Sequence, residues 1–300
     1  MGFTLDSGVV LENWTHTTRA GHRVSGYLSP PSGKPVLHFI HGNGYCGLVY
    51  QPLLSRLSEH YDLFISDIQG HGNSETGDGF VGWNETAELC REVWLHFRPR
   101  WGAVPVIGAG HSFGAIMTSL MLHRQPDLFD RAILLDPVLF SPNMLRVMWL
   151  ATRLGLWHRN AMATRTRRKR RQWPDRDSAR EAFRERGMFR GWDKRALEAY
   201  VTHGLKAQRD AVTLKCPPEL EAQIFSTFPR RLWRSIKAVT TPIHVLYGDS
   251  SYPFVRTCVP RWASLNPAVT AESLPGGHCF MQQDPDRAAE VILARLKSNA

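Results

Sequence analysis

The sequence has no long hydrophobic run and no basic N-terminal segment followed by an apolar core. Its most apolar stretch, residues 144–157, is broken by Arg146 and Arg153. It therefore falls short of the roughly 18 apolar residues that a membrane-spanning helix requires. Asp6 stands where a myristoylation signal needs Ser or Thr. We expect neither a secretory signal peptide nor a transmembrane segment.

Cysteine is scarce, and its pattern shows no pairing. The five cysteines are an odd number and contain no C-x-x-C pair. This pattern argues against a disulfide framework and a zinc site, and it favours free thiols in a reducing cytoplasm. A metal-ligand cluster, a Walker loop and a dinucleotide fingerprint are also missing, so neither a metal nor a cofactor is predicted. The cysteines are Cys46, Cys90, Cys216, Cys258 and Cys279.

The net charge of +10 is distributed unevenly along the chain. Residues 140–240 contain 23 Lys and Arg against 9 Asp and Glu, whereas the rest of the chain contains 14 against 18. The length suits one large domain or a domain that carries an insertion. The basic segment is therefore predicted to be an inserted lobe.

On both sides of this lobe, strand-like and helix-like stretches alternate. Short apolar runs such as residues 35–40 are typical of strands buried on both faces, and residues 113–124 have the pattern of a helix. Strands separated by single helices indicate βαβ units. We therefore predict an α/β core at residues 1–141 and 238–300, with a mostly parallel central sheet flanked by helices. Residues 142–237 show helical stretches and no convincing strand, which predicts an all-helical, strongly basic cap.

The segment Gly110-His111-Ser112-Phe113-Gly114 matches the pattern G-x-S-x-G. In this pattern the serine occupies a sharp, strained turn from a strand to a helix, so that its Oγ projects above the sheet. The context fits, because a predicted strand precedes the motif and a predicted helix follows it. Ser112 is therefore the candidate nucleophile.

A serine nucleophile needs two preorganised N–H donors for the oxyanion of its tetrahedral intermediate. In this strand–turn–helix architecture, one donor is the N–H of the residue after the nucleophile, here Phe113. The other comes from the loop after the third strand, where the sequence reads His41-Gly42-Asn43-Gly44. Asn43 is the predicted second donor, and Gly44 is the next candidate.

The nucleophile also needs a base and an orienting carboxylate, which follow it in the order acid, then histidine. Of the thirteen histidines, only His278 lies after the last predicted strand, in a glycine turn that can swing it over Ser112. Two aspartates end strands after the nucleophile, Asp249 and Asp136. We prefer Asp249 as the acid and keep Asp136 as the alternative. His71 precedes the nucleophile and is expected to be a structural turn residue.

These motifs resemble those of the α/β-hydrolase superfamily, and more closely those of its capped members. The resemblance covers nearly the whole chain and implies the fold and the triad, but it says little about the substrate. Haloalkane dehalogenases and epoxide hydrolases of this group use an aspartate nucleophile, and Ser112 excludes both activities. The matching segments are HGNG at 41–44, DIQGHGNS at 67–74, GHSFG at 110–114, YGD at 247–249 and GGH at 276–278.

The run Arg165-Thr166-Arg167-Arg168-Lys169-Arg170-Arg171 at residues 165–171 is densely cationic. One interpretation is a solvated face of a cap helix, and another is attraction of acidic substrates such as carboxylated esters or acyl-coenzyme A thioesters. No aromatic stacking platform accompanies the run, so a specific nucleic-acid partner is not predicted.

The sequence predicts a cytoplasmic serine hydrolase that cleaves a carboxylic ester of a small molecule through an acyl-enzyme intermediate. A carbon–carbon bond hydrolase and a thioesterase would use the same triad and stay open as alternatives. A ligand-binding or receptor protein on the same fold is the alternative from another class. Leu139 and Phe140 follow a strand end directly, and they are the candidates for the substrate pocket together with Gly44.

Overall fold

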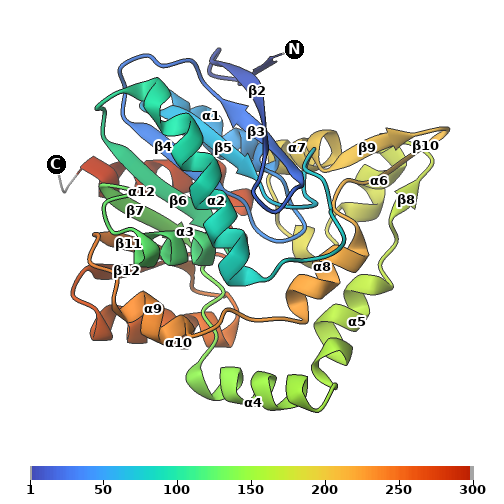
Figure 1. Cartoon of the computed structure of the whole chain (residues 1–300). Helices are drawn as coiled ribbons and strands as arrows, with labels where there is room; N and C mark the ends of the chain where they lie inside the picture. Colours follow the sequence, from blue (N-terminus) through green and yellow to red (C-terminus); the bar gives the residue numbers. More distant parts are fainter. Residues whose placement is uncertain (1, 298–300) are drawn as a thin grey trace.

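The computed structural model describes residues 2–297 and contains one large sheet with helices on both faces (Figure 1). The strand order in this sheet is β1-β2-β3-β5-β4-β6-β7-β11-β12. Within this order, the strands β5, β4, β6, β7, β11 and β12 run parallel to one another. At one edge of the sheet, β1, β2 and β3 pair antiparallel, and β3 is also antiparallel to β5. The strands are β1 (Phe3–Thr4), β2 (Val10–Thr17), β3 (Arg23–Leu28), β4 (Val36–Ile40), β5 (Asp62–Asp67), β6 (Val106–His111), β7 (Arg131–Leu135), β11 (Ile243–Gly248) and β12 (Val269–Leu274).

The helices of the core lie in the crossovers that connect these strands, since neighbouring parallel strands cannot be joined by a tight hairpin. They are α1 (Gln51–Ser58), α2 (Trp83–Phe97), α3 (Phe113–Arg124), α9 (Leu232–Lys237), α10 (Pro253–Leu265), α11 (Phe280–Gln283) and α12 (Pro285–Lys297). Short 3₁₀ helices add η1 (Gly47–Tyr50) and η2 (Arg98–Trp101). The mostly parallel sheet flanked by helices, which the sequence predicts, is confirmed.

The sheet is buried on both faces, which is why its central strands are continuously apolar. In β4, Leu37 and Phe39 pack in one hydrophobic cluster, with side chains of α1 and α12. Val36 and Ile40 alternate with them and pack in a second cluster, with side chains of α2 and α3. Side chains alternate between the faces along a strand, so one short segment anchors both layers.

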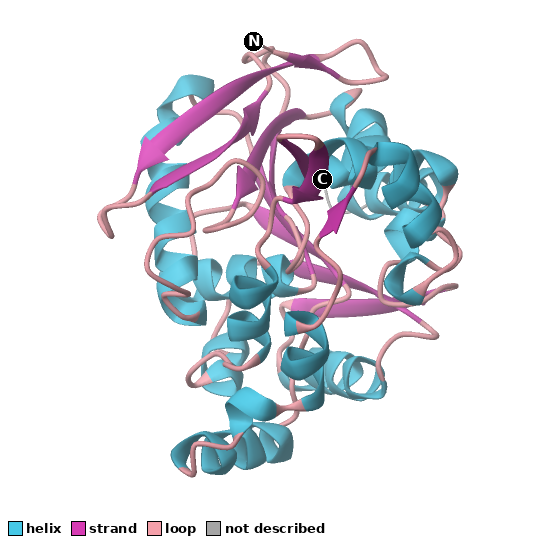
Figure 2. Ribbon diagram, turned by 90° about the vertical axis from the view of Figure 1, so that its right-hand side faces the viewer, coloured by secondary structure: helices cyan, strands magenta, loops and turns pink. Residues whose placement is uncertain are grey.

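The predicted cap corresponds to the segment between β7 and α9, which is inserted as one continuous stretch between core strands (Figures 1 and 2). It ends before residue 237, the predicted bound, because α9 packs with α3 in the hydrophobic core. It is mostly helical, but it also contains a three-stranded antiparallel sheet in the order β8-β10-β9. The expectation of an all-helical cap is corrected in this respect. Its elements are α4 (Pro142–Arg153), η3 (Trp157–Arg159), α5 (Ala161–Arg167), β8 (Gln172–Trp173), α6 (Arg176–Phe183), η4 (Gly187–Phe189), α7 (Lys194–His203), β9 (Leu205–Gln208), β10 (Ala211–Leu214) and α8 (Pro218–Phe225).

The cap strands are too short to carry a clear alternation of apolar and polar residues. Strand β8 has two residues, and β9 and β10 have four each. In β9 only Leu205 is buried, and the three residues after it are exposed. Among the described residues, no helix combines the length and the apolar character that crossing a membrane demands.

Candidate active site

Ser112 lies at the sharp turn between β6 and α3, as the motif predicts. Its backbone has φ 55° and ψ −113°, a conformation that is costly for a residue with a side chain. The turn requires glycine on both sides of the serine. A Cβ at Gly110 would lie 2.6 Å from the main chain of Gly114, and a Cβ at Gly114 would lie 2.2 Å from the carbonyl oxygen of Ile40. These close approaches hold the serine at the apex of a strained turn above the sheet.

His278 contacts Ser112 directly. Its Nε2 lies 2.9 Å from the Oγ of Ser112, the distance of a hydrogen bond in which the hydroxyl donates. On the other side of the ring, Nδ1 donates to Oδ2 of Asp136 over 2.5 Å. Ser112 is 6% exposed and Asp136 is fully buried, whereas the side chain of His278 keeps 20% exposure. The three side chains form a continuous chain from carboxylate to hydroxyl.

The preference for Asp249 as the acid is not supported by this geometry. Asp249 is exposed, and its Oδ1 accepts hydrogen bonds from the Oγ of Ser250 and the main-chain N–H of Gly276, at 2.9 and 3.2 Å. The carboxylate that reaches His278 is Asp136, which the sequence retains as the alternative. Asp249 instead stabilises the glycine turn that leads to His278.

The path of the His278 loop explains this outcome. The loop leaves β12 and passes over the end of β11, where a Cβ at Gly248 would lie 2.3 Å from the carbonyl oxygen of Gly277. The loop therefore reaches the end of β7, the strand beside β11. There Asp136 accepts further hydrogen bonds from the N–H of Gly248 at 2.7 Å and the hydroxyl of Ser251 at 2.5 Å. Ser251 was not anticipated from the sequence.

Of the two candidate oxyanion donors, Asn43 lies in the loop after β4, and Phe113 is the first residue of α3. Within residues 2–297, no hydrogen bond occupies the main-chain N–H of Asn43 or that of Phe113. The side chain of Asn43 turns away and donates to the carbonyl oxygen of Glu221, on α8, at 3.2 Å. The N–H of Gly44, the next candidate, is already bound to Nε2 of His71 at 3.0 Å. The free pair is therefore Asn43 and Phe113.

Two buried, neutral histidines fix the loop that carries Asn43. His41 donates from Nδ1 to the carbonyl oxygen of Gly42 at 2.8 Å, and burial lowers its pKa well below the usual value. His71 donates from Nδ1 to the carbonyl oxygen of Gln69 at 2.9 Å, and burial lowers its pKa to about 4. A neutral ring can then accept the N–H of Gly44 with its other nitrogen. His71 thus serves the turn, as the sequence predicts.

A third neutral histidine links the same loop to His278. The N–H of Gly42 donates to the hydroxyl of Tyr50 at 3.1 Å, and this hydroxyl donates to Nδ1 of His111 at 2.6 Å. Nε2 of His111 then donates to the carbonyl oxygen of His278 at 2.9 Å. Burial lowers the pKa of His111 well below its ordinary value, so the ring keeps one donor and one acceptor nitrogen. The chain of bonds holds both loops in register.

Aromatic side chains pack against Phe113 and His278, the neighbours of Ser112. The ring of Trp83 lies 4.5 Å from that of Phe113 and 6.0 Å from that of Phe140. The ring of Tyr252 lies 4.9 Å from that of His278. Phe140 therefore lies in the aromatic neighbourhood of the site, whereas Leu139 is fully buried in the hydrophobic core.

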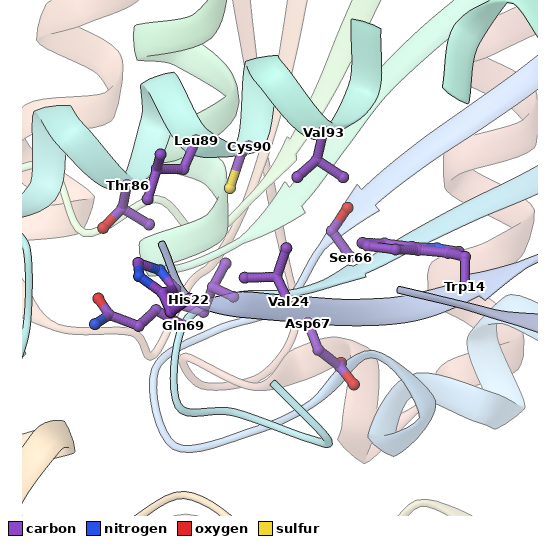
Figure 3. A pocket seen from close by; sticks show the side chains of 11 residues that line it. Trp14, His22, Val24, Ser66, Asp67, Gln69, Thr86, Leu89, Cys90 and Val93 are labelled. Carbon is purple, nitrogen blue, oxygen red and sulfur yellow. The ribbon is translucent and has the colours of Figure 1, made fainter. Parts of the chain in front are cut away.

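Two hollows lie outside the triad. One is a small cavity between α2 and the strands β2, β3 and β5, and its lining includes none of the triad residues (Figure 3). The other is open and lies beside α5 in the cap. Among residues 2–297, no group of three or more His, Cys, Asp or Glu is arranged to hold a metal ion.

A mostly parallel sheet, a serine at a strained turn after β6 and a histidine after β12 together define the α/β-hydrolase fold. A family model described as the alpha/beta hydrolase family matches residues 39–291. The chain belongs to this family and is an α/β-fold hydrolase.

Known relatives agree with this assignment. The chain is 30% identical to the abhydrolase domain-containing protein AKT2 of Alternaria alternata, over 63% of this chain and 81% of that protein. It is 26% identical to the type I acyl-CoA thioesterase mpaH of Penicillium roqueforti, over 64% of this chain and 50% of that protein. Among solved structures, E-2-(acetamidomethylene)succinate hydrolase has the same fold, with a TM-score of 0.75 at 18% identity, over 95% of this chain and 98% of that one.

Proposed function

We propose that this hydrolase cleaves a carboxylic ester of a small molecule with Ser112 as nucleophile, His278 as base and Asp136 as the orienting acid. The hydrogen-bonded chain from Asp136 through His278 to Ser112 carries the proposal. A serine hydroxyl is a weak nucleophile unless an adjacent base takes its proton, and the base must hold the correct tautomer. The contact between Nδ1 of His278 and Asp136 selects that tautomer.

In the first step, Ser112 Oγ attacks the acyl carbon while Nε2 of His278 takes the hydroxyl proton. The buried carboxylate of Asp136 stabilises the imidazolium that forms. The N–H groups of Asn43 and Phe113 donate to the oxyanion. When the tetrahedral intermediate collapses, His278 returns the proton to the leaving alcohol, and the acyl group stays on Ser112.

In the second step, His278 takes a proton from a water molecule, which attacks the acyl-enzyme ester. The same oxyanion donors stabilise the second intermediate. Its collapse releases the carboxylic acid and restores the hydroxyl of Ser112. Every proton that leaves Ser112 or water passes through the one nitrogen that faces the nucleophile.

A thioester is the second candidate substrate, because the relative mpaH is named an acyl-CoA thioesterase. The same steps apply, with His278 returning the proton to the sulfur so that a thiol leaves. A carbon–carbon bond substrate and a receptor role without catalysis use the same fold, and no observation favours either. All five cysteines are buried and unpaired, which supports a reducing cytoplasm as the site of action.

The test is hydrolysis of nitrophenyl esters of short to medium acyl length, together with labelling by a neutral fluorophosphonate. We expect the variant Ser112→Ala to lose several orders of magnitude in kcat/KM and all labelling. The variant Ser264→Ala is the matched control, because Ser264 is exposed and its hydroxyl donates to the carbonyl oxygen of Arg261 within α10, away from the triad. Labelling without ester hydrolysis would direct attention to thioesters. A wild-type protein that is never labelled would refute the proposed nucleophile.

A further inference from the structure

The cap carries cations around an open hollow beside α5. Arg159, Arg165 and Arg168 line it, together with Ala161 and Thr164. Both Arg165 and Arg168 are exposed, and they are three residues apart, the spacing that places side chains on one side of a helical turn. Within residues 2–297, none of the three guanidinium groups has an acidic partner.

Several other cations of the cap are paired with carboxylates. Lys169 binds the carboxylate of Glu221, and Arg171 lies 3.4 Å from Glu219. Arg180 binds Glu198 at 2.7 Å. Cations that face one another in a hollow without counter-charges raise the local positive potential, and such a potential concentrates anions.

The segment that carries these cations is fixed to the candidate active site. The carboxylate of Glu221, which Lys169 binds, packs against Gly44 in the loop after β4, where a Cβ would lie 3.0 Å from its Cδ. The main-chain oxygen of Glu221 accepts the side-chain amide of Asn43. The residue that follows Arg168 is thereby anchored beside the candidate oxyanion donors.

On the other side of Ser112, the ring of Tyr252 lies 4.9 Å from the ring of His278. Burial raises the pKa of Tyr252, and the positive charge of Arg165 opposes this rise. The placement of the segment beside the candidate active site rests on the contacts of Lys169 and Glu221 with the loop after β4.

We propose that Arg165 and Arg168 form a subsite for an anionic group of the substrate, a carboxylate or a phosphate, beside the acyl bond to be cleaved. The planar guanidinium fork matches either group and stays charged at every physiological pH. The inference rests on the proposed function and narrows its substrate class to anionic esters or thioesters. Arg159 adds positive potential at the edge of the hollow.

The experiment compares substrates that differ only in charge. The nitrophenyl ester of pentanoic acid is compared with the mono-nitrophenyl ester of glutaric acid, which has the same chain length and a terminal carboxylate. The butyryl thioester of phosphopantetheine is compared with the butyryl thioester of pantetheine, which lacks the phosphate. The first pair tests a carboxylate in the acyl part, and the second pair tests a phosphate in the leaving group.

We expect the wild type to prefer the charged member of at least one pair. The double variant R165Q/R168Q should lower kcat/KM for that member by roughly 5- to 30-fold, the effect of losing two solvent-accessible ion pairs, and leave the neutral member unchanged. Raising the ionic strength should reduce the preference of the wild type. The control K206Q/R209Q removes two exposed cations from the hairpin of β9 and β10 and should change neither value.

Two results would overturn the subsite and leave the proposed function unaffected. One is turnover of the neutral ester without any preference for the charged substrate, and the other is a preference that R165Q/R168Q retains. If no substrate is turned over, the labelling rates of two fluorophosphonates, with and without a terminal carboxylate, measure the same preference at Ser112. Absence of labelling would overturn the proposed nucleophile and the subsite together.

Discussion

The two aspartates at the ends of β7 and β11 give the sharpest test of the proposed mechanism. Asp136 is fully buried and accepts hydrogen bonds from Nδ1 of His278, the hydroxyl of Ser251 and the N–H of Gly248. Asp249 is exposed and does not reach the imidazole. Replacing each by asparagine keeps the volume and removes the charge.

The outcome for Asp136→Asn follows from the donors around it. The N–H of Gly248 can only donate, so the amide oxygen of the asparagine stays on that side. Its NH₂ group then faces Nδ1 of His278 and donates to it, which places the imidazole proton on Nε2. A protonated Nε2 cannot take the proton of Ser112. A wrong tautomer of this kind costs a serine triad about 10⁴ in kcat, or about 5 kcal/mol.

The assay is kcat and KM for a nitrophenyl ester, with circular dichroism to verify folding. We expect Asp136→Asn to lose about 10⁴-fold in kcat with little change in KM. Asp249→Asn keeps an oxygen that can accept the N–H of Gly276, so a change of about threefold or less is expected. A loss of more than 100-fold in Asp249→Asn, or activity near wild type in Asp136→Asn, would refute the assignment of the acid.

Three further variants test the supporting structure. Ser251→Ala removes one hydrogen bond to Asp136 and should lower kcat by about 3- to 30-fold at constant KM; an unchanged kcat would show that this hydroxyl does not hold the carboxylate. Gly114→Ala forces a Cβ to 2.2 Å from the carbonyl oxygen of Ile40, so we expect loss of both soluble protein and Ser112 labelling, and a folded, labelled variant would contradict the tight turn. Burial lowers the pKa of His38 to about 3, so the unfolded chain takes up a proton below pH 6.5 that the folded chain refuses, and stability falls as the pH falls. Between about pH 7 and pH 5, the free energy of unfolding measured by urea denaturation should therefore fall by about 2 kcal/mol less in His38→Leu than in the wild type. An equal fall in both proteins would contradict this.

The core could be predicted from the sequence because its signals are local and consistent. The pattern predicts a helix at residues 113–124, and α3 has those bounds. The continuous apolar run at residues 35–40 corresponds to β4. A helix of this kind buries one apolar stripe against the sheet, and a central strand is buried on both faces. The spacing of apolar residues in the sequence therefore follows directly from the packing.

The cap could be predicted less well because its elements depend on tertiary contacts. Helix α5 is short and rich in arginine, and only Ala163 and Thr166 are buried, so its sequence lacks an apolar stripe. Strand β10 pairs with its neighbour in sequence, β9, and with β8, which lies about forty residues before it. Their pairing provides the regularity that their residues lack.

The choice of acid shows a different limit. Asp136 and Asp249 both follow strand ends, and the two strands are neighbours. Which carboxylate meets His278 depends on the path of the loop above Gly248, a contact between residues far apart in the sequence. The local sequence pattern therefore restricts the candidates for the acid to two residues, and only the path of the loop in three dimensions distinguishes between them.

The division of the chain into core and cap also separates two tasks. The proposed nucleophile, base and acid all follow core strands, whereas the unpaired arginines of the hollow belong to the cap segment around α5. The rest of the chain has more acidic than basic residues, so the positive field comes from the cap. Because the two sets of side chains share no hydrogen bond among the described residues, removing cap charge should alter the choice between substrates and leave labelling of Ser112 by a neutral probe unchanged.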